Sequence, residues 1–162
     1  MKKKKILEAV IDFLCSAIVQ NQEILDRTHQ SINDAPSAME SGSDTSRFQL
    51  SSLAQNQLAA IDKLVEVKHQ VEILKETLGS SSATEIKPGS IIEVEVNEKV
   101  LLYLILPCEG IGGMEVEWNS HIYVMISDGS PFINALKGCH KGDELSIVMG
   151  GHIKKVKVLD VY

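Results

Sequence analysis

Two long stretches of helical periodicity constrain this chain more than any other feature of its sequence. Between residue 6 and about residue 30, apolar side chains recur in alternating steps of three and four, with Asn21 in the same stripe: Leu7, Val10, Leu14, Ala17 and Ile24. A second stripe comprises Leu50, Ala54, Leu58, Ile61, Leu64, Val71, Leu74 and Leu78. Neither stretch has Pro or Gly in its interior, so each predicts one uninterrupted amphipathic helix.

The segment between the two stripes, residues 31–46, has the composition of a helix breaker. It holds one Pro, one Gly and five serines, and Asp44, Thr45 or Ser46 could each cap the second helix. At about 1.5 Å rise per residue the helices would be roughly 40 and 48 Å long, more than a globular domain needs. Two such helices pair antiparallel and bury each other's stripes. The sequence therefore predicts a coiled-coil hairpin over residues 1–79, with its tip at about residues 31–46.

Beyond residue 79 the pattern of the chain changes. Residues 80–87 form a linker, and from residue 88 the apolar pattern becomes strand-like. Short runs rich in Val, Ile and Leu occupy residues 91–96, 100–106, 121–126, 145–149 and 154–161. Residues 131–136 suit two turns of helix, with Ser130 as the cap and Pro131 at the first helical position. The prediction is an α+β fold: a helical hairpin, then a small, mostly antiparallel β domain with one short helix over residues 88–162.

The charge of the chain argues against a direct electrostatic attraction to nucleic acid or to a membrane. The formal net charge is -6, with 9 Lys or Arg against 11 Asp or Glu in residues 1–83 and 7 against 11 in residues 84–162. Neither half is basic, whereas binding to phosphates requires a cationic surface. We therefore expect a protein partner, through which nucleic acid is reached only indirectly.

The start of the chain and its cysteines suggest a cytoplasmic protein. Four lysines precede an apolar run as in a secretory signal, but Glu8 and Asp12 interrupt that run and no small-residue cleavage site follows. No stretch approaches the roughly 20 apolar residues of a membrane span. Cys15, Cys108 and Cys139 are odd in number and lack CxxC spacing, so neither a disulfide framework nor a zinc site is predicted.

The run SDGSPFINALKGCHKGDEL at residues 127–145 resembles the signature of the Gre family of bacterial transcription factors. That family has a Ser-Pro step, a short helix that ends in Ala-Leu-x-Gly, and a Gly-Asp-Glu that leads into the last hairpin. The Lys-Pro-Gly-Ser entry at residues 87–90 is also similar. With the preceding helical hairpin, the resemblance covers the whole chain in the family's order.

The resemblance implies an FKBP-like C-terminal domain and bacterial RNA polymerase as the partner. It implies that the C-terminal domain docks at the rim of the polymerase's secondary channel while the coiled coil enters the channel. The expected role is regulation of elongation by promoting cleavage of backtracked transcripts. Such a factor activates the polymerase's own endonuclease and is not itself an enzyme.

The hairpin tip supplies the candidate catalytic residues, Glu40 and Asp44. Family members that stimulate cleavage carry two tip acids thought to help hold a magnesium ion in the polymerase active site, a role suited to carboxylate oxygens. The chain would have no cofactor of its own and no metal site when isolated. The family's cleavage-competent tip has an Asp three residues before a Glu, and this pattern is absent here. Residues 44–47 instead resemble a divergent Gre-like branch, with Ser41 three residues before Asp44.

Asp128, Ser130 and Pro131 are the candidates for contact with the polymerase, because the resemblance places this turn near the docking surface. The alternative from the residues themselves is that Ser130 and Pro131 are structural, since Ser is a favoured N-cap and Pro suits the first helical position. Asp44 likewise has the alternative role of capping the second helix. We expect Gly138 and Gly142 to be turn residues with positive φ.

Three other functions remain open. The chain could bind the secondary channel without promoting cleavage and act as an inhibitor or regulator of the polymerase. A prolyl isomerase is suggested only by the FKBP-like fold, and fold alone does not carry activity. The chain could also be a coiled-coil adaptor with no polymerase role. Polar Asn21 and Thr28 in the first stripe favour one defined hairpin, hence a monomer, over open-ended association.

Overall fold

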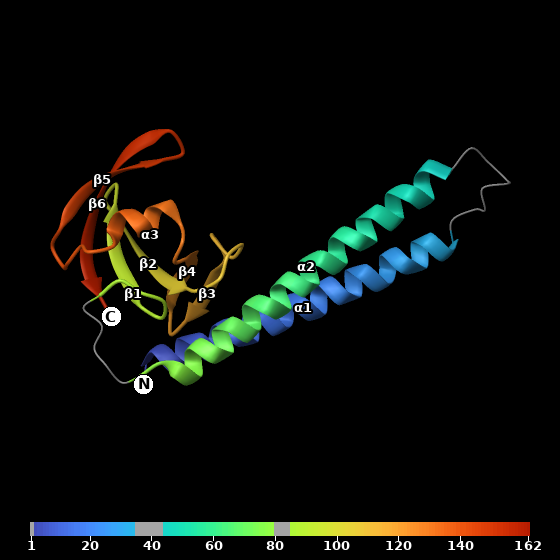
Figure 1. The fold of residues 1–162 in the computed structure, drawn as a ribbon, viewed down its shortest axis with the longest axis horizontal. Helices are drawn as coiled ribbons and strands as arrows, with labels where there is room; N and C mark the ends of the chain where they lie inside the picture. The colour runs from blue at the N-terminus through green and yellow to red at the C-terminus, as the bar shows by residue number, and fades with distance from the viewer. Residues whose placement is uncertain (1, 35–43, 80–84) are drawn as a thin grey trace. The chain divides into compact units, whose positions relative to one another are not determined.

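The computed structural model describes residues 2–34, 44–79 and 85–162 (Figure 1). Two helices come first, α1 (Lys2–Asp34) and α2 (Asp44–Thr77). They are followed by β1 (Ile91–Val96), β2 (Lys99–Leu106), β3 (Glu115–Trp118), β4 (His121–Ser127), α3 (Pro131–Leu136), β5 (Glu144–Met149) and β6 (His152–Val161). The predicted fold class, two long helices and then a small β domain with one short helix, is confirmed.

By its internal contacts the chain divides into two compact units. The first consists of Met1–Ile11 and His69–Tyr162, and the second of Asp12–Lys68. The division falls within both long helices, so the start of α1 and the end of α2 belong to the same unit as the sheet. The domain boundary expected near residue 79 stays a prediction. No helix among the described residues has the length and apolar character needed to cross a membrane.

The two helices run antiparallel and bury apolar side chains against each other. In the second unit the buried cluster is Leu25, Ala54 and Ile61, with Ile18 and Ile32 packed against it. In the first unit Glu8 of α1 lies 3.6 Å from the Lys75 ammonium of α2. The pairing of the two stripes is therefore as predicted, although not every position in them is.

Two of the residues that the sequence analysis assigned to the buried stripes are exposed instead, so those two assignments are wrong. Ile24 is 47% exposed and Leu25 takes the inward position at 9%, while Leu58 is 51% exposed and its neighbour Gln57 is half-buried. In α1 the inward series continues from Leu14 as residues 18, 21, 25, 28 and 32. The step from 14 to 18 is four residues rather than three, which keeps the stripe closer to the 3.6-residue period of a straight helix.

Some inward positions between the two helices of the second unit hold polar rather than apolar side chains. Asn21 donates its Nδ2–H to the carbonyl of Ala17 at 2.8 Å, and the hydroxyl of Thr28 donates to the carbonyl of Ile24 at 2.9 Å. Both bonds stay within α1. The Gln57 side-chain oxygen is buried and has no hydrogen-bond partner among the described residues. Polar groups left in such a position reduce the stability gained from packing.

The strands form one six-stranded sheet in the order β3-β4-β2-β1-β6-β5. Four of the pairings are antiparallel, and β2 pairs with β4 in parallel. All five predicted strands are present with ends shifted by two residues or fewer. The sequence analysis missed β3, a four-residue strand at the edge of the sheet.

The core of the β domain lies between α3 and one face of the sheet. Phe132, Ile133 and Leu136 are the buried residues of α3, and the Phe132 ring lies 5.1 Å from that of Tyr103 between centroids. Other members of this cluster come from the central strands and the flanking chain: Ile86, Ile92, Val94, Val96, Ile105, Ile147, Val156 and Val158. Burial of these side chains fixes α3 on the sheet.

The corrected seam predicts a difference between two Leu-to-Ala substitutions in the second unit. Leu25→Ala should lower the free energy of unfolding of the helical hairpin by about 2 kcal/mol or more, because it removes a buried side chain. Leu58→Ala should change it by less than about 0.5 kcal/mol, since that side chain is mostly solvated. Denaturant unfolding followed by circular dichroism at helix wavelengths measures both. Equal effects of the two substitutions would contradict the observed seam.

Candidate functional site

The turn that leads into α3 is held by its own side chains. Ser130 is extended, with φ -64 and ψ 145, and its hydroxyl oxygen accepts a hydrogen bond from the backbone N–H of Ile133 at 3.2 Å. Pro131 follows as the first helical residue, where its missing N–H costs nothing. The predicted cap is confirmed, so the Ser-Pro step has a structural role that needs no partner.

Asp128 is also engaged within the turn. The Lys137 ammonium lies 3.3 Å from its Oδ1, an ion pair whose geometry is not that of a hydrogen bond. Its backbone N–H donates to the carbonyl of Leu106 at 2.9 Å. Of the three predicted contact residues, Asp128 and Ser130 are therefore half-buried and internally bonded, and Pro131 is exposed. Contact of any of them with a partner stays a prediction.

The rest of the signature run forms the turn between α3 and β5. Gly138 and Gly142 have φ of 86 and 96, which confirms the expectation that glycine is needed there. The Asp143 carboxylate accepts a hydrogen bond from the backbone N–H of His140 at 2.8 Å. Glu144 then begins β5 and pairs with Lys157 of β6 at 2.9 Å, and the hydrogen bond from Lys157 lowers the pKa of Glu144.

The side chains of the predicted tip site lie outside the described residues. Glu40 lies outside the described residues, and Asp44 is the first residue of α2 with a side chain that also lies outside them. Their catalytic assignment stays a prediction. Within residues 2–34, 44–79 and 85–162, no three His, Cys, Asp or Glu side chains come close enough to hold a metal ion.

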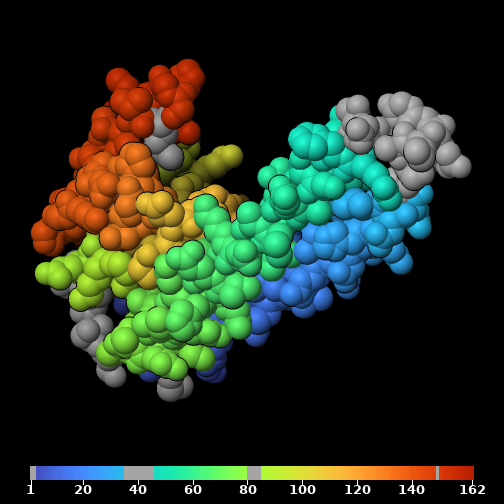
Figure 2. Space-filling model, turned by 45° about the vertical axis from the view of Figure 1, so that its right-hand side comes forward, coloured from blue at the N-terminus to red at the C-terminus, as the bar shows by residue number. Residues whose placement is uncertain are grey.

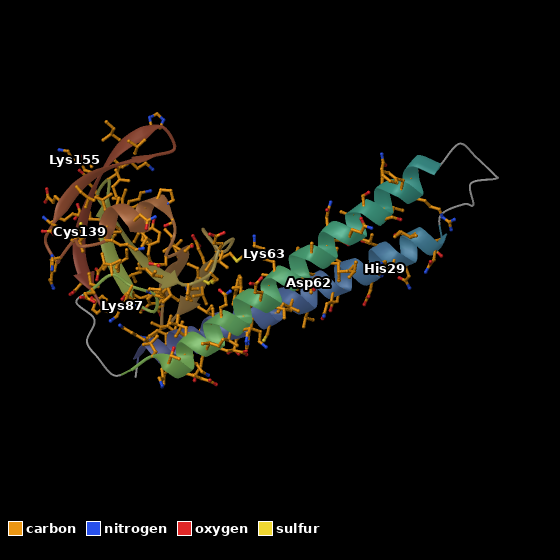
Figure 3. All side chains as sticks on the ribbon, in the orientation of Figure 1. His29, Asp62, Lys63, Lys87, Cys139 and Lys155 are labelled. Carbon is orange, nitrogen blue, oxygen red and sulfur yellow. The ribbon has the colours of Figure 1, made fainter. Side chains whose placement is uncertain are left out.

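The surface of the helices in the second unit is polar but carries isolated apolar side chains. Figure 3 labels His29 on α1 and Asp62 and Lys63 on α2, all three of which are exposed. Ile24 and Leu58, which do not lie in the seam, are exposed on the same two helices. A surface with both signs of charge suits a helical pair that stays solvated.

An exposed apolar pair at the end of the β5–β6 hairpin is the surface feature that the sequence analysis missed. Val148 and Ile153 are direct cross-strand partners and are 69% and 75% exposed. Figure 2 shows this end of the hairpin at the edge of the first unit. The signal was available, because Gly150 and Gly151 between two strand-like runs predict a tight hairpin, and Val148 and Ile153 lie close to its turn.

Two of the five aromatic residues in residues 88–162 that an isomerase pocket could use, Tyr103 and Phe132, are core residues. Tyr103 and Phe132 are 9% and 7% exposed and pack on each other between the sheet and α3. They contribute to the stability of the domain rather than lining an open site. These two rings are therefore not available to line an isomerase pocket.

The sequence matches no protein-family model and no curated protein. The chain is similar to several solved structures, of which three follow. Gfh1 of Thermus aquaticus is 22% identical over 96% of this chain and 95% of its own, with a TM-score of 0.39. The GreA factor homolog 1 of Thermus thermophilus is 21% identical over 94% of each chain, with a TM-score of 0.38. A GreA/GreB elongation factor of Nitrosomonas europaea is 20% identical over 57% of this chain and 89% of its own, with a TM-score of 0.36.

The capping role of Ser130 can be tested by substitution. Ser130→Ala should destabilise the β domain by about 1 kcal/mol because the Ile133 N–H loses its acceptor, whereas Ser130→Asp, which can cap equally well, should not. Ser146→Ala, at an exposed position of β5, is the matched control. Amide hydrogen exchange of α3 reports the change. If Ser130→Asp lowers the exchange protection of α3 as much as Ser130→Ala does, the Ser130 hydroxyl does more than cap the helix.

Proposed function

We propose that this chain is a Gre-type transcription elongation factor that binds bacterial RNA polymerase and acts through the secondary channel. The single observation that carries the proposal is the run of residues 127–145, which resembles the Gre signature and folds as one local unit. Ser130 caps α3, Gly138 and Gly142 turn the chain, and Glu144 begins β5. The run follows two helices of 33 and 34 residues, as the resemblance requires.

The helical pair of the second unit supports the insertion part of the proposal. Residues 12–34 of α1 alone extend about 35 Å at the helical rise, and most of their side chains are solvated rather than buried in a core. A helix pair of this length can carry the segment that joins its helices deep into a narrow opening. The segment carries Glu40, and α2 begins at Asp44.

The chemistry at the tip would be the donation of oxygen ligands to magnesium. Glu40 and Asp44 would help to hold a metal ion and its water at the polymerase active centre, where the polymerase supplies the remaining ligands and the catalytic site. The factor would then stimulate cleavage of a backtracked transcript without being an enzyme. It would reach nucleic acid only within the elongation complex and would work as a monomer in the cytoplasm.

A second candidate function is occupation of the channel without cleavage. The observation that favours it is Ser41, which stands three residues before Asp44, where the family's paired acid would be expected. A tip with one effective carboxylate would hold a metal ion less well than a pair. Such a factor would slow or regulate the polymerase.

The tip acids predict a separation of binding from cleavage. The double variant Glu40→Gln, Asp44→Asn removes both charges and, because Asn caps as well as Asp, preserves the capping role that the sequence predicts as the alternative for position 44. Its stimulation of transcript cleavage by stalled elongation complexes should fall about tenfold or more, as metal ligands are lost. Its affinity for core polymerase should be unchanged.

Asp62→Asn, at an exposed acid of α2, is the control and should cleave like the parent chain. Unchanged cleavage by the double variant would remove the tip carboxylates from the mechanism. Binding without any cleavage by the parent chain would establish the second candidate. Failure of the parent chain to bind core polymerase would overturn both.

A further inference from the structure

The two edges of the sheet differ in how well they are protected against pairing with a further strand. β3 and β5 are the outermost strands (Figure 1). β3 is only four residues long and carries Glu115 and Glu117, both of which are exposed. Short length and charged side chains are features by which natural proteins keep an edge strand from pairing. The edge at β3 is therefore protected.

The edge at β5 lacks these protections. The strand is six residues long, and residues 145–149 include no charged residue, no Pro and no Gly. Its register with β6 runs without a bulge from Glu144 to Met149. Among the described residues, β6 is the one strand that pairs with β5, so backbone N–H and C=O groups on the other side of β5 are used by no strand of the sheet. Such an edge is a template for the addition of a strand.

The side chains of β5 offer apolar contacts on both faces of an added strand. On the face that α3 covers, Ile147 belongs to the buried cluster, and Leu145 at its margin is half-buried. On the opposite face, Val148 and its cross-strand partner Ile153 are 69% and 75% exposed. Residues of an added strand would lie directly beside the β5 side chains. Aliphatic residues in that strand would therefore remove apolar surface from water on both faces.

The charges at the start of β5 favour a basic residue in the added strand. A row of side chains crosses β1, β6 and β5 in the order Glu95, Lys157 and Glu144. The hydrogen bond to Glu144 and the charges of Glu144 and Glu95 raise the pKa of Lys157, so one ammonium serves two carboxylates. A Lys or Arg directly opposite Glu144 would continue the alternation of charge, whereas an Asp or Glu there would repel that carboxylate. Lys155 lies one row away on β6, two strands from the added position.

We propose that the free edge of β5 binds an extended segment of another protein as an added antiparallel strand, the pairing that is more stable per residue. The segment carries aliphatic residues beside Leu145, Ile147 and Val148 and a Lys or Arg beside Glu144. A second copy of this chain fits the edge less well, because β5 itself contains no Lys or Arg. The site lies outside the tip and the turn of residues 127–131, so it does not depend on the proposed role in transcription.

A short peptide tests the proposal on the full chain: acetyl-Thr-Val-Ile-Thr-Val-Lys-amide, whose Lys would lie opposite Glu144. By calorimetry it should bind with a dissociation constant below about 1 mM. A peptide with Pro in place of Ile should bind about tenfold more weakly or worse, because Pro has no backbone N–H and does not fit a strand interior. A peptide with Glu in place of Lys should bind about threefold more weakly or worse, since two carboxylates would then be opposite each other.

Amide hydrogen exchange and matched variants locate the site. With the peptide bound, backbone amides of residues 144–149 should exchange more slowly, because edge N–H groups gain acceptors, while those of β3 should not change. Val148→Lys places a charge on the free edge and should weaken binding about tenfold or more. Ile122→Lys, at an exposed aliphatic position of β4, is the control and should bind like the parent chain.

Four outcomes would each overturn the proposal. They are absence of peptide binding, equal binding of the Ile and Pro peptides, equal losses in the two Lys variants, and protection of β3 in place of β5. Sedimentation of the parent chain tests the choice of occupant. Dimers that form with rising concentration and are abolished by Val148→Lys would mean that a second copy takes the edge, which would contradict the proposed partner.

Discussion

The packing of α1 on α2 is the interaction on which the rest of this structure depends. The described residues of the second unit all belong to these two helices, so each helix can bury its apolar stripe only against the other. The shared core there is small, with Leu25, Ala54 and Ile61 as its buried residues. Helices of this length are stable in water chiefly through such an amphipathic seam and less through propensity. Loss of the seam would therefore remove any means of presenting the segment between the helices.

The buried apolar contacts between α1 and α2 are few, yet they determine which faces of the two helices pair. Asn21 and Thr28 bond to carbonyls of their own helix, and Gln57 brings a buried oxygen without a described partner. These groups add little attraction between the helices, so the aliphatic positions must define which faces meet. The exposed Ile24 and Leu58 show how near an alternative pairing lies in sequence, one residue away on each helix. Buried contacts at Leu25 and Ile61 select the observed one.

The β domain is held in a different way, by a core on one face of the sheet and by turn chemistry in residues 127–145. Several positions of that run have a local structural role: Ser130 caps α3, Asp128 and Lys137 form an ion pair, and Gly138 and Gly142 have positive φ. A run so constrained is strongly tied to its backbone conformation. Its resemblance to the Gre signature therefore predicts the local fold directly, and it bears on polymerase binding only through the surface that this fold exposes.

The parts of the fold that were predictable are those set by local chemistry. The ends of α3 follow from Ser130, Pro131 and Gly138, each of which acts on the backbone within a few residues. The choice between Ile24 and Leu25 could not be made from sequence, because adjacent aliphatic residues fit the periodicity equally well. The edge strand β3 was missed because it is only four residues long, Glu-Val-Glu-Trp. So short an alternation of polar and apolar residues does not distinguish a strand from a loop.

The candidate sites divide in the same manner. Asp128, Ser130 and Pro131 are placed, while Glu40 and the side chain of Asp44 lie outside the described residues, so their role still rests on the resemblance.

Delivery of the tip to the polymerase active centre is the central claim, and site-specific photo-crosslinking tests it most directly. A photoreactive amino acid would replace Glu40 in one chain and Lys155, exposed on β6, in another, each bound to a stalled elongation complex. The account predicts that position 40 crosslinks to the segments around the catalytic magnesium or to the transcript's 3′ end, whereas position 155 does not. A chain that stays bound while position 40 gives no such crosslink would contradict it.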